Sequence, residues 1–197
     1  LVMINGKSPM RKHLEGLDKA GFSKVVINVA HLGFKICKEF GNQFGKNISI
    51  RYSFEPLGAL ETAGGIAFAE PWDIPNEPFL VINSDIWSDW DLNQAYEMRK
   101  IVLENDLWGC LIMVKNSEDG NGDYSLDISS KLYDKFNLLE NTKSKFEKLT
   151  FSGIGVYTSR MFESVVRGKP TALKNIFDYG ISRNLIIGKK HDGVWID

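Results

Sequence analysis

Two aspartates follow short apolar segments of the kind that form buried strands. Asp85 comes after the run FLVI at residues 79–82 and the polar pair Asn83-Ser84, and Asp197 comes directly after VWI at residues 194–196. Ligands of open α/β sheets gather at the carboxyl ends of the strands, so a carboxylate there points into the expected site. Two hard oxygen donors are what Mg²⁺ requires when water and phosphate supply its other ligands. An aspartate after a strand also often caps a turn, and the local pattern leaves both interpretations open.

The segment EPLGALETAGG at residues 55–65 is a second candidate for ligand binding. It combines a turn with a glycine- and alanine-rich stretch that we expect to open a helix. Small residues let a flat ligand approach the backbone closely, and free amides at a helix start favour anions. By contrast, Gly6-Lys7-Ser8 resembles only the tail of a P-loop. That motif needs a glycine five positions earlier, where this chain has Leu1, so we exclude it.

The bulk composition argues against two classes of partner. The chain has 197 residues, 24 of them basic and 25 acidic, and its formal net charge is -1. Such a balance gives no field for capturing nucleic acid or an anionic membrane. Cys37 and Cys110 lie far apart and form no CxxC pair, which favours reduced core residues over a disulfide or zinc site. With no long apolar run or leader-like start, we expect a cytoplasmic protein.

The positions of the strands and helices that hold these residues follow from hydrophobic spacing. Strands are predicted at residues 1–4, 24–30, 48–54, 79–82 and 107–114, and helices at residues 9–21, 33–40 and 92–103. Ser8 is the expected N-cap of the first helix, with Pro9 at its first position. The third is expected to bury Leu92, Ala95, Tyr96 and Val102. This strand-helix alternation predicts an α/β fold with a doubly wound, mostly parallel sheet over residues 1–115.

The pattern changes after residue 115. A polar loop is predicted at residues 116–122, short strands at 124–128, 131–139 and 149–157, helices at 160–167 and 171–183, and final strands at 184–187 and 193–196. We therefore expect a second, smaller antiparallel part over residues 116–197 that returns to the core. The chain begins and ends inside predicted strands, at Leu1 and Asp197, and we expect native sequence beyond both ends.

Five segments in this order carry a resemblance to a known family: AGFSKVVINVAHLG, EPLGALETAGGI, FLVINSDIW, GDYSLD and LTFSGIGVY. Together they resemble the sugar-1-phosphate nucleotidyltransferases over essentially the whole chain. Within that family the chain most resembles the N-acetylmuramate-1-phosphate uridylyltransferases, because LETAGGI replaces the GTAGA-like segment of the mannose-1-phosphate guanylyltransferases. The resemblance implies a Rossmann-like, GT-A-like nucleotide-binding core with a sugar-binding part.

The resemblance also implies a reaction and a set of site residues. A sugar-1-phosphate, N-acetylmuramate-1-phosphate on this resemblance, attacks the α-phosphorus of UTP with Mg²⁺ present, giving a nucleotide-sugar and pyrophosphate for peptidoglycan recycling. Asp85 and Asp197 match the two aspartates that hold the metal in this family. The other matched positions are Glu55, Glu61, Thr62, Ala63 and Gly64 for the nucleotide, and Asn83, Asp123, Ser125, Ser152 and Gly153 for the sugar phosphate.

Two family features have no counterpart in this chain. The glycine-rich GxGTRxxP loop, which binds the triphosphate, and the lysine after it would precede the residues matching Leu1-Val2. Without them we expect poor nucleotide binding and little catalysis. The glutamate-lysine pair that many relatives place before the sugar-pocket strand is also missing, since Glu147-Lys148 lies too close to that strand.

Three alternative functions stay open. The first is a mannose-1-phosphate guanylyltransferase. The second is a metal-dependent glycosyltransferase that uses Asp89-Trp90-Asp91 as a DxD pair, although Asp91 is also a natural helix N-cap. The third is a non-catalytic domain that binds sugar nucleotides. The base, the sugar and the oligomeric state are not decided by the sequence.

Overall fold

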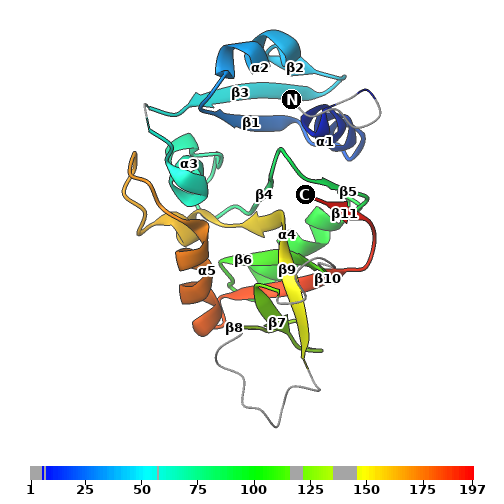
Figure 1. Cartoon of the computed structure of the whole chain (residues 1–197), viewed down its shortest axis with the longest axis vertical. Coiled ribbons are helices and arrows are strands. Elements are labelled where there is room, and N and C mark those ends of the chain that lie inside the picture. The colour runs from blue at the N-terminus through cyan, green and yellow to red at the C-terminus, as the bar shows by residue number, and fades with distance from the viewer. Residues whose placement is uncertain (1–5, 7, 57, 116–121, 135–145) are drawn as a thin grey trace. The chain divides into compact units, whose positions relative to one another are not determined.

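The computed structural model describes residues 6, 8–56, 58–115, 122–134 and 146–197 (Figure 1). Its contacts divide the chain into two compact units, Leu1–Asp73 with Phe162–Leu173 and Ile74–Met161 with Lys174–Asp197. This division differs from the boundary that we expected at residue 115. Residues 74–115 fall with the C-terminal part because their strands pair with a long strand of that part. The predicted strand at residues 1–4 and the predicted loop at 116–121 lie outside the described residues.

The first unit is a small three-stranded sheet with helices. Its elements are α1 (Pro9–Lys19), β1 (Lys24–Val29), α2 (Gly33–Phe40), β2 (Gln43–Phe44), β3 (Ile48–Phe54) and α3 (Glu61–Ala69). The strand order is β1-β3-β2, with β1 parallel and β2 antiparallel to β3. The α1 start confirms the predicted cap, since Ser8 Oγ accepts a hydrogen bond from the Arg11 N–H at 3.3 Å. Met10, Leu14 and Leu17 form its buried face.

The second unit is built around one long strand, β9 (Glu147–Tyr157). Its other elements are β4 (Phe79–Ile82), β5 (Trp87–Ser88), α4 (Gln94–Glu104), β6 (Gly109–Val114), β7 (Tyr124–Leu126), β8 (Leu132–Asp134), η2 (Ser159–Phe162), α5 (Leu173–Ser182), β10 (Ile186–His191) and β11 (Trp195–Ile196). Strand order in the large sheet is β10-β6-β9-β7-β8, and β4 also pairs with β9. The helix α5 packs on β9 through Phe177, whose ring contacts those of Phe151 and Tyr157.

Three expectations about this second unit were wrong. The strand at residues 79–82 was assigned to a parallel sheet, but β4 runs antiparallel to β9, from Phe79 opposite Tyr157 to Ile82 opposite Ile154. In α4 the side chain of Tyr96 is 47% exposed, because the buried stripe passes through Met98 instead. The predicted helix at residues 160–167 is only the short 3-10 turn η2. The α/β fold itself, with mixed sheets, is confirmed.

Candidate active site

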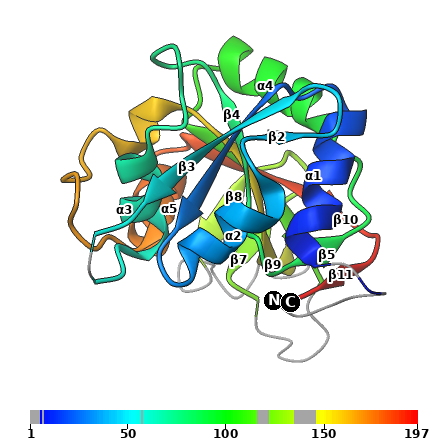
Figure 2. The same cartoon turned by 90° about the horizontal axis from the view of Figure 1, so that it is seen from above.

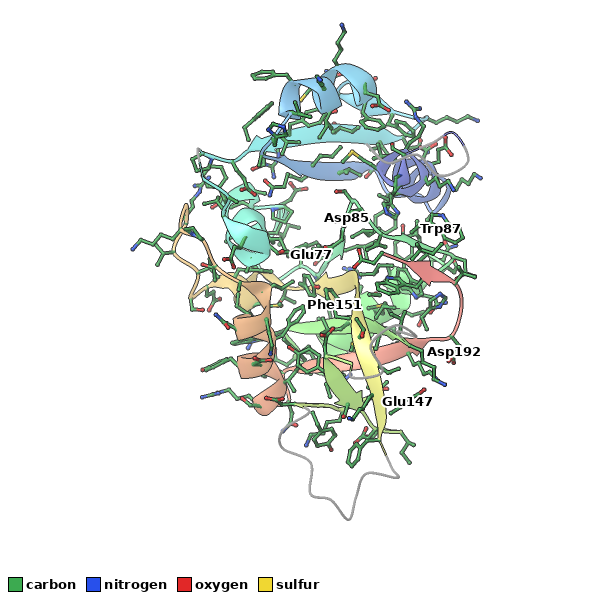
Figure 3. All side chains as sticks on the ribbon, in the orientation of Figure 1. Glu77, Asp85, Trp87, Glu147, Phe151 and Asp192 are labelled. Atoms are coloured by element: carbon green, nitrogen blue, oxygen red, sulfur yellow. The ribbon has the colours of Figure 1, made fainter. Side chains whose placement is uncertain are left out.

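A short antiparallel pairing of β5 with β11 connects the two chain segments that carry the predicted metal ligands. Trp195 lies opposite Ser88 and Ile196 opposite Trp87, so continuing the register sets Asp197 opposite Ile86, next to Asp85. The C-terminal end lies beside β5 in both views (Figures 1 and 2). Asp85 lies on the segment between β4 and β5, where Figure 3 labels it. Asp85 and Asp197 are both exposed residues.

This donor set fits Mg²⁺. A pair of carboxylates leaves room for the water and phosphate oxygens that Mg²⁺ normally keeps as its other ligands. Among the residues that the structure describes, no group of three or more His, Cys, Asp or Glu side chains is arranged to hold a metal.

The residues predicted to hold the sugar phosphate lie on or beside β9. The Asn83 N–H donates to the Gly153 carbonyl at 2.9 Å, which ties the end of β4 to the middle of β9. Ser152 is buried, and its Oγ accepts from the Ile154 N–H at 3.2 Å. Asp123 Oδ2 accepts from the Phe151 N–H at 2.9 Å. These contacts bring Asn83, Ser152 and Gly153 together, whereas Asp123 lies toward Phe151.

Ser125 is the fifth of these residues, and its environment is different. It lies on β7 opposite Lys148 of β9 and is fully buried. Its Oγ has no hydrogen-bond partner among the described residues. A buried hydroxyl without a partner costs free energy, so it calls for an explanation. A polar group of a ligand is one partner that this position can take.

The predicted nucleotide-binding residues lie in the first unit, where Glu55 organises the loop before α3. Its Oε1 accepts a hydrogen bond from Asn28 Nδ2, and its Oε2 accepts one from the Leu60 N–H at 2.9 Å. A Cβ added to Gly65 would lie only 2.5 Å from Asn28 Nδ2 and 2.7 Å from Glu55 Oε1. Glycine at residue 65 therefore leaves space for this pair, and a larger residue would have to displace one of the two side chains.

The start of α3 is less open to anions than we expected. The N–H groups of Ala63 and Gly64 both donate to the Thr171 carbonyl, at 3.1 and 3.2 Å. A Cβ at Gly64 would lie 2.6 Å from the Lys169 carbonyl oxygen. The expectation of free amides is thus wrong for Ala63 and Gly64, because the segment 169–171 already occupies them. Glu61 and Thr62 remain exposed, and Glu61 has the positive φ of 56°, a conformation that is strained for a non-glycine residue.

The whole chain was compared with known protein families and proteins. The chain matches no family model. It is 35% identical over 201 residues to the N-acetylmuramate alpha-1-phosphate uridylyltransferase of Neisseria meningitidis serogroup B, covering 100% of this chain and 82% of that protein. The chain belongs to the sugar-1-phosphate nucleotidyltransferases. It is thus a member of an enzyme family.

Other relatives of this nucleotidyltransferase agree on the family and differ in substrate. The mannose-1-phosphate guanyltransferase beta-B of Xenopus laevis is 26% identical, and the chain spans 54% of its length. A structure of a putative glucose-1-phosphate thymidylyltransferase from Bacillus anthracis matches with a TM-score of 0.77 at 14% identity, covering all of this chain and 79% of that one. HddC from Yersinia pseudotuberculosis, complexed with GMP-PN, matches with a TM-score of 0.71 at 17% identity, covering all of this chain and 82% of that one. The structural matches support the fold.

Both aspartates of the possible DxD pair, Asp89 and Asp91, already accept hydrogen bonds from other residues of the chain. Asp89 Oδ1 accepts a hydrogen bond from the Val194 N–H and contacts His191 Nε2, each at 2.8 Å. Asp91 Oδ1 accepts from the N–H and the Nδ2 of Asn93, at 3.0 and 2.8 Å, just before α4. Both carboxylates are already engaged within the nucleotidyltransferase chain, which disfavours a role as a metal-binding pair.

Charged groups beside the sheet form one ion-pair network. Glu147 pairs with Lys115 at 3.1 Å and with Lys190 at 2.9 Å, and Lys190 also pairs with Asp192 at 2.7 Å. Figure 3 labels the two acidic members. The hydrogen bond from Lys190 holds the pKa of Glu147 below its ordinary value, and the one to Asp192 raises the pKa of Lys190. Because Lys115 and Asp192 are exposed and Glu147 and Lys190 are partly exposed, water screens these pairs and the network contributes little to stability.

Three residues that hold the candidate site in place, Trp195, Asn28 and Thr171, were not predicted from the sequence. Trp195 Nε1 donates to the Ser152 carbonyl at 2.8 Å and so links β11 to β9. Asn28 and Thr171 hold the loop before α3 and its first turn. A tryptophan two residues before a predicted metal ligand, and an asparagine inside an apolar strand, are the signals that can find such residues.

We expect Gly153→Ala to lower the free energy of unfolding by about 2–3 kcal/mol, because Gly153 has a φ of +81° and its Cβ would lie 3.0 Å from Asn83. The matched control is Gly168→Ala, where φ is +79° but nothing lies within 4 Å. That variant should lose only the backbone term, about 1 kcal/mol. Urea unfolding of both variants measures the difference. Equal losses would contradict a steric role for Asn83.

Proposed function

We propose that this chain forms the catalytic part of a uridylyltransferase that joins UTP to N-acetylmuramate-1-phosphate and releases pyrophosphate. The observation that supports the proposal is the β5–β11 pairing, in which Ile196, the residue before Asp197, lies opposite Trp87, two residues after Asp85. The choice of uridine and muramate is supported by the identity to the Neisseria meningitidis protein and by the segment LETAGGI.

The reaction in this proposal needs positioning more than acid-base chemistry. The attacking oxygen of a sugar-1-phosphate is already an anion, so no general base has to remove a proton from it. Asn83, Ser152 and Gly153 hold the sugar phosphate, and Glu55 with residues 61–64 holds the base. A bound Mg²⁺ supplies neutralisation of phosphate charge, and Asp85 and Asp197 are the side chains that hold it. The remaining rate enhancement comes from in-line placement of the two phosphates.

The test is pyrophosphate release by the full-length gene product. The proposal predicts release with UTP, N-acetylmuramate-1-phosphate and Mg²⁺, and loss of release when EDTA is added. Faster release with GTP and mannose-1-phosphate would favour a guanylyltransferase. Consumption of a nucleotide-sugar by an acceptor would favour a glycosyltransferase. UTP binding in calorimetry without pyrophosphate release from any of these pairs would favour a non-catalytic domain.

We expect Glu55→Ala to raise KM for UTP about tenfold and to leave KM for the sugar-1-phosphate within about twofold, since the lost hydrogen bonds are worth roughly 1 kcal/mol each. The physical reason is that Glu55 fixes both Asn28 and the Leu60 N–H, so the loop before α3 loses its frame. Steady-state kinetics with each substrate varied measure the effect. Glu104→Ala, an exposed glutamate of α4, is the control. A larger effect on the sugar-1-phosphate would remove this loop from base recognition.

A further inference from the structure

The turn between β10 and β11 is held to the segment after β5 by one side chain, Asp89. Its Oδ1 accepts a hydrogen bond from the Val194 N–H and lies 2.8 Å from His191 Nε2. The Asp89 N–H in turn donates to the Val194 carbonyl at 3.2 Å. Asp89 and Val194 are 105 residues apart in the sequence, so this is a long-range tie and not a local turn.

Gly193 leaves the space that this tie needs. A Cβ at residue 193 would lie 2.3 Å from Asp89 Oδ1 and 2.5 Å from His191 Cε1. Gly193 is not among the glycines with positive φ, so its backbone conformation is open to other residues. A side chain at residue 193 would therefore have to displace the side chains of Asp89 and His191.

The hydrogen bonds between Asp89 and Val194 lie close to Asp197 along the chain and so affect the position of Asp197. The strand β11 is only two residues long and forms two register pairs with β5. So short a strand has few ladder hydrogen bonds of its own, so contacts outside the ladder matter for its position. Asp89 holds Val194, three residues before Asp197, and Trp195 adds its hydrogen bond to the Ser152 carbonyl.

We propose that Asp89 is a positioning residue that fixes the place of Asp197 through Val194 and His191. The inference rests on the proposed function, in which Asp197 holds the metal. Residues behind metal ligands orient them, and their loss commonly weakens metal affinity or activity about 10- to 100-fold. Asp89 itself does not touch the metal in this proposal, because its Oδ1 already has two partners in the chain.

The test compares Asp89→Ala, Asp89→Asn and Gly193→Ala in the full-length gene product. Both contacts end on one oxygen, Oδ1, and asparagine keeps that acceptor. We expect Asp89→Ala and Gly193→Ala to lower kcat/KM and to weaken Mn²⁺ binding with UTP present about 10- to 100-fold, and Asp89→Asn to stay within about threefold of wild type. Asp91→Ala is the surface control. Hydrogen exchange at the Val194 amide should accelerate in Asp89→Ala and Gly193→Ala and stay at the wild-type rate in Asp89→Asn and Asp91→Ala.

The outcomes separate a positioning role from other roles. Loss in Asp89→Asn as large as in Asp89→Ala would make Asp89 a ligand and overturn the proposal. Unchanged exchange at Val194 in Asp89→Ala would overturn it as well. The exchange experiment does not depend on turnover. A wild-type protein without activity would contradict the proposed function, but the exchange rate of the Val194 amide would still test whether Asp89 holds this segment. Gly193→Ala keeps every side chain of the tie, so it covers the case in which Asp89→Ala does not fold.

Discussion

We expect Asp85→Asn in the full-length gene product to lower the turnover of UTP and sugar-1-phosphate by about two or more orders of magnitude, on the scale of lost electrostatic stabilisation at a reacting phosphate. Asparagine has nearly the same size as aspartate but lacks the negative charge, so the change removes a metal ligand without creating a cavity. The exposed position of Asp85 means that the variant should fold normally. Pyrophosphate release at saturating substrate measures the loss.

The control for this prediction is Asp91→Asn, six residues further along the chain. Asp91 Oδ1 accepts from Asn93 before α4, and asparagine can keep this bond. We expect turnover within about twofold of wild type, as for most surface substitutions. Retained activity in Asp85→Asn, or a loss in the control as large as in Asp85→Asn, would remove Asp85 from the mechanism.

The second large effect is expected for Asp197→Asn, again about two or more orders of magnitude in turnover. The sharper result comes from the double variant Asp85→Asn with Asp197→Asn. Groups that act as one unit are strongly non-additive, so the double variant should lose about as much as either single variant. Mg²⁺ titrations of the residual activity should show the same shift in all three. Multiplying losses would mean that the two aspartates act at separate places.

Much of the local structure could be predicted because its causes are local. The cap at Ser8 and the spacing of Leu14 and Leu17 define α1, and the helix α2 and the strand β3 have the predicted bounds. Side-chain alternation and capping involve residues a few positions apart, and the sequence shows these directly.

The pairing of strands could not be read in the same way. The strand β4 has the apolar run of a parallel strand, yet its partner is antiparallel β9, about 75 residues later along the chain. Periodicity says that a strand is buried and does not say which strand covers it. The same limit applies to Tyr96, which was predicted to be buried with Leu92 and Val102 but is exposed, whereas Met98 is buried.

In the candidate site, too, residues within local motifs could be predicted from the sequence, whereas long-range contacts could not. The motif segments identified the family and named Asp85, Asp197 and the residues near β9 as candidates. The contacts of Asp89 with His191 and Val194 join positions 102 and 105 residues apart, and no local pattern marks them. The local sequence likewise predicted free amides at the start of α3. This prediction failed because the Thr171 carbonyl, which accepts from the Ala63 and Gly64 amides, is more than 100 residues away in the sequence.

The most direct test of metal binding by Asp85 and Asp197 is a crystal structure of the full-length protein with Mn²⁺ and a UDP-sugar, with the metal located by its anomalous signal. We predict one ion with an oxygen of Asp85 and an oxygen of Asp197 each within roughly 2.0–2.3 Å, the range for hard divalent cations. An ion held by neither carboxylate, or two ions held separately by Asp85 and Asp197, would contradict it.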